Sequence, residues 1–327
     1  MFDVTALGEV LIDFTPSGLS QSGQRLFEQN PGGAPANVLT ALANCGLKTA
    51  MIGKVGDDMH GIFLQETLKK VGIDCTGLLI DPQVFTTLAF VALSDSGDRT
   101  FSFARKPGAD TMLTAEEVEQ HRSKIEESRI LHVGSLSLTA EPSRAATFRA
   151  LQIARDQHIL ISYDPNYRAP LWDSEQEAIK EMRAVIPYVD VMKMSDEETE
   201  LLTGIKDPKQ AAQALMQDGV SLVAVTLGAQ GAYVACAEGG MLVPGFKSRV
   251  VDTTGAGDSF WGGFLYSLLE SGKSPKAVTL KEAVAFARFG NATAGLCVEK
   301  RGGIPAIPFL SEIRNLLASQ LSGDKIS

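Results

Sequence analysis

The residues best placed to do chemistry lie between Asp252 and Asp258, in a segment that reads D-T-T-G-A-G-D. From Asp258 onward, apolar residues recur at helical spacing, so Gly255 to Gly257 lie at or just before the first turn of a helix. The amide groups of a first turn have no partner within the helix, and such small residues let a phosphate approach them. The segment therefore predicts an anion hole, which would stabilise charge developing on a transferring phosphoryl group.

Asp258 stands next to this predicted anion hole. A carboxylate at that point is well placed to take a proton from an attacking hydroxyl group. The simpler interpretation of the same residues is a helix cap preceded by a tight glycine turn, and a lone G-x-G-D would favour it. The longer pattern D-T-T-G-A-G-D-x-F-x-G-G favours the chemical interpretation, together with a distant segment from Pro31 to Asn37 that reads P-G-G-A-P-A-N.

On these two segments the chain resembles the PfkB, or ribokinase-like, family of carbohydrate kinases, and it matches both signatures of that family. The resemblance covers nearly the whole chain, from the G-E-V-L-I-D segment that ends at Asp13 to Gly302 and Gly303. It implies an enzyme that transfers the γ-phosphoryl group of ATP to a primary hydroxyl group of a sugar. The catalytic residues that it implies are Gly255, Ala256, Gly257 and, as the base, Asp258.

The same resemblance implies a sugar site. The residues that it places there are Asp13, Gly32, Gly33, Asn37, Phe103, Arg105 and Arg168. Asp13 comes after the first strand-like run, and Phe103 and Arg105 come from a predicted hairpin that can cover the substrate. Taken alone, the two glycines would be a helix-entry turn and the arginines would be surface residues.

The resemblance also implies a nucleotide site and two cation sites. The nucleotide-binding residues would be Lys193, Ser195, Glu198, Thr226, Gly228, Gly231 and Asn291. Glu198 resembles the glutamate that organises water around Mg²⁺, although many relatives have Asn at the position of Ser195. Asp252, Thr254 and Gly302 match the positions of a K⁺ site. Taken alone, Glu198 is a carboxylate at the start of a helix, where the helix dipole stabilises it anyway.

Three segments resemble bacterial fructokinases within the family: Pro31 to Asn37, Arg105 to Leu113, and Lys193 to Glu198. They predict transfer to D-fructose, which would give D-fructose 6-phosphate. One alternative is a 2-keto-3-deoxygluconate kinase, in which Arg105 and another arginine would pair with the substrate carboxylate. An aminoimidazole riboside or ribose kinase is another alternative. A sugar-binding regulator without catalysis is the alternative of a different class, and the intact G-A-G-D argues against it.

The elements that must position these residues follow an alternating pattern. Apolar runs such as RILHVGSL and LVAVTLG alternate with amphipathic segments such as PSRAATFRALQIARD. This alternation predicts a mainly parallel sheet with helices on both faces. Asp13, Asp164 and Thr226 follow strand-like runs, at the edge where such sheets bind ligands. We therefore expect an α/β fold, and the resemblance implies the ribokinase-like three-layer α/β/α sandwich.

Residues 86 to 105 depart from this pattern, since they alternate apolar and polar residues on either side of a turn at Asp95 to Asp98. They predict a β-hairpin, and residues 14 to 30 could pair with it to form a small lid. A hairpin alone is marginally stable in water, so we expect contact with the substrate, the large domain or a second subunit in a lid-mediated homodimer. We predict one kinase domain over residues 1–319 and a flexible tail over 320–327.

Composition excludes several other classes of protein. The 39 acidic and 30 basic residues give a net charge of −9, which disfavours nucleic acid or an anionic membrane as the main partner. Four widely spaced cysteines indicate reduced core thiols rather than disulfides or a zinc site. The chain starts without a leader-like segment, and no apolar run approaches the roughly 20 residues that span a bilayer, so we expect a cytoplasmic protein.

Overall fold

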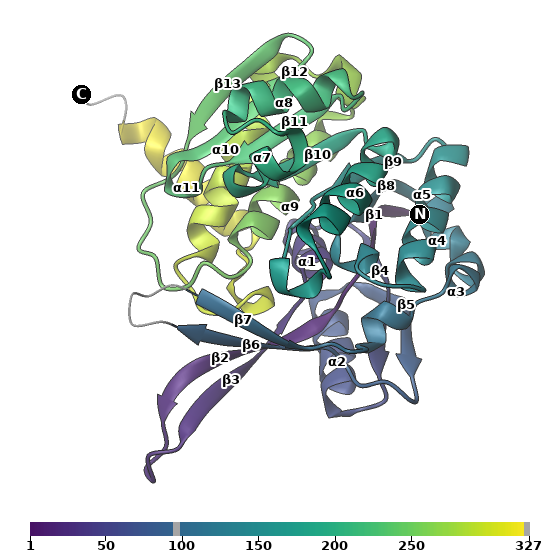
Figure 1. Cartoon of the computed structure of the whole chain (residues 1–327). Helices are drawn as coiled ribbons and strands as arrows, with labels where there is room; N and C mark the ends of the chain where they lie inside the picture. The colour runs from purple at the N-terminus through teal and green to yellow at the C-terminus, as the bar shows by residue number, and fades with distance from the viewer. Residues whose placement is uncertain (94–98, 324–327) are drawn as a thin grey trace.

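The computed structural model describes residues 1–93 and 99–323, which contain a nine-stranded central sheet in the order β13-β12-β11-β10-β9-β8-β1-β4-β5 (Figure 1). Its neighbours pair in parallel except for β11–β12 and β12–β13, so the predicted mainly parallel sheet is confirmed. The strands are β1 (Phe2–Leu7), β4 (Thr49–Gly56), β5 (Asp74–Asp81), β8 (Ser128–Val133), β9 (Leu160–Tyr163), β10 (Val191–Ser195), β11 (Leu222–Thr226), β12 (Gly231–Cys236) and β13 (Gly239–Pro244).

Helices cover both faces of the sheet, as the alternation in the sequence predicts, and a buried hydrophobic cluster fills the space on each side. One face carries α1 (Ala34–Asn44), α2 (Met59–Val71), α9 (Ala256–Ser271), α10 (Leu280–Cys297) and α11 (Leu310–Gly323). The other face carries α3 (Ala115–Gln120), α4 (Arg122–Glu126), α5 (Ser143–Asp156), α6 (Glu175–Val185), α7 (Asp196–Thr203) and α8 (Pro208–Gln217). The result is the expected α/β/α sandwich.

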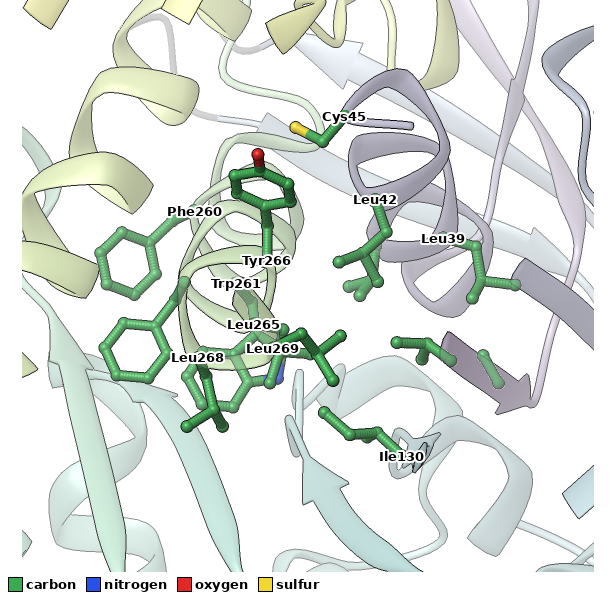
Figure 2. Close-up of a cluster of buried hydrophobic side chains, with 14 of the residues drawn as sticks. Leu39, Leu42, Cys45, Ile130, Phe260, Trp261, Leu265, Tyr266, Leu268 and Leu269 are labelled. Carbon is green, nitrogen blue, oxygen red and sulfur yellow. The ribbon is translucent and has the colours of Figure 1, made fainter. Parts of the chain in front are cut away.

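Helix α9 packs closely against two other helices near the predicted site. Figure 2 shows its Trp261 in the buried cluster that also contains Leu42 of α1 and Ile130 of β8. Gly262 lets α1 approach, because a Cβ atom there would lie 2.4 Å from the Cβ atom of Ala41. Gly263 does the same for α10, since its Cβ atom would lie 2.4 Å from the hydroxyl group of Thr293. The paired glycines of the signature thus fix the position of the helix that carries Asp258.

A separate four-stranded sheet, in the order β3-β2-β6-β7, forms the predicted lid and projects from the sandwich in Figure 1. Its strands are β2 (Leu11–Leu19), β3 (Arg25–Gly32), β6 (Leu88–Leu93) and β7 (Arg99–Ala104). The antiparallel pairing of β6 with β7 confirms the hairpin, while its predicted turn at Asp95 to Asp98 lies outside the described residues.

Two expectations about element boundaries need correction. The first apolar run is not one strand, because β1 ends at Leu7 and β2 pairs with the lid strands β3 and β6. Asp13 therefore lies within a lid strand rather than directly after the first core strand. At the other end, α11 continues to Gly323, past the predicted start of the tail at residue 320, and its Leu316 and Leu317 pack against the core.

The four cysteines are free and buried, as predicted for core thiols. In the described part of the chain, no helix is long and apolar enough to cross a membrane.

Candidate active site

A cavity of about 530 Å³ lies where the core strands end and the lid begins. It brings together residues from both signatures, from the lid and from the strand ends. The predicted site residues that line it are Asp13, Gly33, Asn37, Phe103, Arg168, Lys193, Ser195, Glu198, Thr226, Thr254, Gly255, Ala256, Gly257 and Asp258. Most of the residues that the sequence singles out therefore share one site.

The first turn of α9 forms one wall of this cavity. Gly255 is its N-cap and has a φ of 75°, in the left-handed region that glycine adopts without strain. The backbone N–H groups of Gly257 and Asp258 donate to no acceptor among the described residues. They remain available to an anion, whereas the N–H group of Ala256 donates to the carbonyl oxygen of Thr253 at 3.2 Å. The role of this turn as an anion hole stays a prediction.

Asp258 lies in this first turn and is only 8% exposed. The side-chain amide of Asn37 donates to its Oδ2 atom at 2.8 Å, which joins the two signatures across 221 residues of sequence. Burial raises the pKa of Asp258 above its ordinary value, while the charge of Lys193 and the hydrogen bond from Asn37 lower it. The carboxylate is therefore a stronger base than one exposed to water.

The lid strand β2 carries Asp13 into the same cavity. A Cβ atom at Gly32 would lie 2.4 Å from the Oδ2 atom of Asp13, so this glycine makes room for the carboxylate without lining the cavity itself. Gly33 has a φ of 109°, and its Cβ atom would lie 2.4 Å from the carbonyl oxygen of Glu9. Burial raises the pKa of Asp13 to about 7, against the effect of the Arg168 charge.

A buried cation and two carboxylates lie in or directly after strands β9 and β10, and two of these residues, Lys193 and Glu198, line the cavity. Lys193 donates to Asp164 at 2.8 Å. Glu198 accepts hydrogen bonds from the backbone of Ser195 at 2.7 Å and from the backbone of Tyr167 at 2.6 Å. Glu198 is thus the third residue of α7 and completes a capping box with Ser195, and it also lines the cavity. It lies at the start of a helix, as its simplest interpretation predicts, but it is buried rather than solvated.

Several predicted residues lie outside the cavity lining: Gly32, Arg105, Gly228, Gly231, Asn291, Asp252 and Gly302. Arg105 is buried and donates to Asp110, Thr139 and the carbonyl oxygen of Leu136. The amide of Asn291 donates to the carbonyl oxygens of Val243 and Pro244. The assigned roles of these residues stay predictions.

The structure adds a residue that the sequence reasoning did not select. Glu9 lines the cavity and is 2% exposed. Its Oε1 atom accepts a hydrogen bond from Ala34 at 3.0 Å, whereas Oε2 has no hydrogen-bond partner in the described part of the chain. Burial raises its pKa to about 7. The available signal was an acidic residue directly after the apolar run that ends at Leu7.

The other lining residues that were not selected are Leu11, Ala34, Leu136, Asn166, Tyr167, Glu197 and Thr253. They lie within a few residues of predicted ones or, in the case of Leu136, follow a core strand.

The sequence matches the family model described as pfkB family carbohydrate kinase over residues 1–310. The chain is 41% identical over 321 residues to probable fructokinase-5 of Arabidopsis thaliana, with 97% of this chain and 98% of that protein covered. A fructokinase structure from Vibrio cholerae has a TM-score of 0.87 at 32% identity and covers 97% of this chain and 98% of its own. A fructokinase structure from Xylella fastidiosa has a TM-score of 0.87 at 31% identity, with 98% and 99% covered.

The raised pKa of Asp13 predicts a pH-dependent instability of the protein without ligands. Its folded-state pKa of about 7 lies above the ordinary value of 3.8, so stability falls as pH rises through this interval. Asp13→Asn should therefore be more stable than the wild type at pH 8, by about 1 kcal/mol or more, and the difference should shrink toward pH 4. Urea unfolding at several pH values measures this difference.

The matched control for this measurement is Asp173→Asn, which changes an exposed carboxylate. It should leave the unfolding free energy nearly unchanged at each pH. An Asp13→Asn protein that is no more stable than the wild type at pH 8 would contradict the inference that the buried, charged Asp13 side chain destabilises the folded protein.

Proposed function

The chain belongs to the pfkB family of carbohydrate kinases, and we propose that it is an ATP-dependent fructokinase that converts D-fructose to D-fructose 6-phosphate. Fructokinase relatives at about 40% identity over nearly the full length support the substrate. The observation that carries the proposal is Asp258, held by Asn37 at 2.8 Å beside the open amide groups of α9. A base and an anion hole in one cavity support catalysis rather than sugar binding alone.

In the mechanism that we infer, a primary hydroxyl group of the sugar attacks the γ-phosphorus atom of ATP in line with the leaving oxygen. The new bond joins the sugar oxygen to phosphorus, and the bond from phosphorus to the ADP oxygen breaks. Asp258 accepts the hydroxyl proton on its carboxylate. The amide groups of Gly257 and Asp258 stabilise the charge on the transferring group, and Asp13 accepts hydrogen bonds from sugar hydroxyl groups.

The residues present fit a hydrated Mg²⁺ ion. In the described part of the chain, no group of three or more His, Cys, Asp or Glu side chains could enclose a metal. Asp164 has a buried Oδ1 atom without a hydrogen-bond partner in the same part of the chain, and Glu198 lines the cavity nearby. Such carboxylates suit Mg²⁺, which keeps several waters and binds substrate phosphates. When bound, Mg²⁺ would neutralise phosphate charge.

The proposed K⁺ site is supported by one link between two loops. The carboxylate of Asp252 accepts hydrogen bonds from the backbone of Thr254 at 2.8 Å and of Gly302 at 3.1 Å. These oxygen-rich loops adjoin the first turn of α9, and oxygen donors suit K⁺. The Vibrio cholerae fructokinase structure is described as a form with fructose, ADP and a potassium ion bound.

The lid supports a substrate role for Phe103 and a different role for Arg105. Phe103 lines the cavity, whereas the guanidinium group of Arg105 is 3% exposed and pairs with Asp110 at 2.7 Å. Its hydrogen bond to the Leu136 carbonyl oxygen ties the end of β7 to the cavity wall. With its donors used inside the protein, Arg105 is better suited to hold the lid over a neutral sugar than to bind a substrate carboxylate.

The first test of the mechanism removes the base. Asp258→Asn should fold and bind ATP normally, while kcat falls at least about a hundredfold, because the amide cannot accept the hydroxyl proton. Steady-state kinetics, thermal unfolding and calorimetric ATP titration measure these three properties. Turnover close to that of the wild type would remove Asp258 from its role.

The second test concerns the substrate. With ATP and Mg²⁺, fructose should give a higher kcat/KM than ribose, aminoimidazole riboside or 2-keto-3-deoxygluconate. A site built for particular hydroxyl groups leaves its own polar groups unpaired when a ligand lacks them, so discrimination can reach roughly 10⁴-fold. A clear preference for the riboside or the keto acid would overturn the fructokinase assignment and leave the kinase assignment intact.

The third test concerns the lid as a dimer surface. Leu26 and Phe27 of the lid are both 44% exposed, and Phe27 meets the ring of Phe90 at 6.3 Å. Light scattering at micromolar concentration should give twice the mass of one chain, and Phe27→Asp should shift the mass toward that of one chain. The matched control is Phe309→Asp, which changes an exposed phenylalanine at the start of α11. A wild-type monomer would contradict the proposed dimer.

A further inference from the structure

A buried ion pair joins two neighbouring strands beside the cavity, and its lysine lines the cavity. Lys193 lies in β10, and Asp164 directly follows β9. The Nζ atom of Lys193 lies 2.8 Å from the Oδ2 atom of Asp164, and the two side chains are 6% and 2% exposed. Isolated buried charges are costly, so a pair this deep in the protein fixes the position of its cation closely.

The ammonium group of Lys193 points at the anion hole. A Cβ atom built on Gly257 would lie 3.0 Å from its Nζ atom, and both residues line the cavity. An ammonium group has three N–H donors, and in the described part of the chain it meets a single acceptor, the carboxylate of Asp164. Two donors therefore remain to be satisfied from the side of the cavity.

We propose that Lys193 is a catalytic residue that contacts the transferring phosphoryl group, and that Asp164 is the positioning residue that aims it there. This inference deepens the proposed kinase function and rests on it. In this role, Lys193 stabilises the transition state of phosphoryl transfer, and it contributes little to the binding of ATP before the reaction. The ammonium group of Lys193 is already in place where negative charge develops on the transferring phosphoryl group. The side chain therefore does not have to move during the reaction.

The charges around Lys193 support this assignment. Lys193 forms its 2.8 Å ion pair with Asp164 among further carboxylates. Burial opposes the charged form, but the carboxylates of Asp164, Glu198 and Asp258 outweigh burial and raise the pKa of Lys193. Its charge in turn lowers the pKa of Asp258 against the effect of burial. The other titratable or charged groups that face this cluster are Asp13 on β2, Arg168 after β9, Asp252 before α9 and His132 on β8.

The first experiment compares Lys193→Met with Lys54→Met in the full-length protein. Lys54 is an equivalent buried lysine outside the cavity, with a 7% exposed side chain that pairs with Glu117 at 2.6 Å. Lys193→Met should lower kcat about 10²- to 10³-fold, whereas Lys54→Met should affect mainly stability. With Lys193 absent, the acidic limb of the kcat profile should also move to higher pH, because Asp258 loses a neighbouring positive charge.

Binding measurements distinguish stabilisation of the transition state from ordinary binding of the nucleotide. ADP with aluminium fluoride and the preferred sugar mimics the planar phosphoryl group during transfer. Lys193→Met should weaken the calorimetric affinity for this mixture by a factor close to the loss in kcat, with the affinity for ADP alone changed less than about threefold. An equal loss for ADP alone and for the mimic would overturn the proposal, because it would show ordinary nucleotide binding.

The double variant Asp164→Asn/Lys193→Met guards against a folding defect. Lys193→Met leaves the Asp164 carboxylate buried and unpaired, and the second change removes that charge. The double variant should regain thermal stability while its kcat stays well below that of Asp164→Asn alone, which shares any loss of Mg²⁺ binding. A double variant as active as Asp164→Asn would make the pair structural and overturn the proposal. A wild-type enzyme that phosphorylates no sugar would instead refute the proposed function, so the two failures are distinguishable.

Discussion

The arrangement of the site depends on one electrostatic constraint, the burial of several carboxylates around a single cavity. Asp13, Asp164 and Asp258 all have a raised pKa, mainly because burial disfavours the charged form. Glu198 adds its charge to the fields at Asp164 and Asp258. Lys193 is the buried cation among them, and the first turn of α9 contributes a positive dipole end. In the proposed mechanism, this arrangement keeps Asp258 a strong base beside the binding site of a highly charged nucleotide.

The fold satisfies this constraint by collecting distant segments at one edge of the sheet. Strands β9, β10 and β11 run in parallel, so their carboxyl ends bring Asp164, Lys193 and Thr226 to the same side. Helix α9 then places Asp258 opposite them, and its Gly262 allows α1 to approach closely enough for Asn37 to reach the carboxylate. The close packing of α9 is therefore part of the geometry proposed for catalysis and not only a source of stability.

Much of this arrangement could be predicted from the sequence. Alternating strands and helices indicated the sandwich, and the two signatures identified the N-termini of α1 and α9. The sequence did not reveal that β2 leaves the core sheet, because its apolar run is continuous with β1 and only the pairing partners differ. Arg105 was assigned to the substrate, and Glu9 was not selected, for a related reason. Whether a charged side chain faces the cavity or an internal partner depends on tertiary contacts such as the pair with Asp110.

The course of β2 has a thermodynamic consequence. Asp13 lies in the middle of the lid sheet, paired with Asn30 of β3 and Ala89 of β6, so a carboxylate that lines the cavity is part of the lid. In the proposed function Asp13 binds the sugar, and movement of the lid would displace it, so lid position and sugar affinity would be linked. By reciprocity, any contact that favours the closed lid tightens sugar binding by the same factor by which the sugar favours closure. The edge of this small sheet is thus a point at which another molecule could tune substrate affinity without touching the substrate.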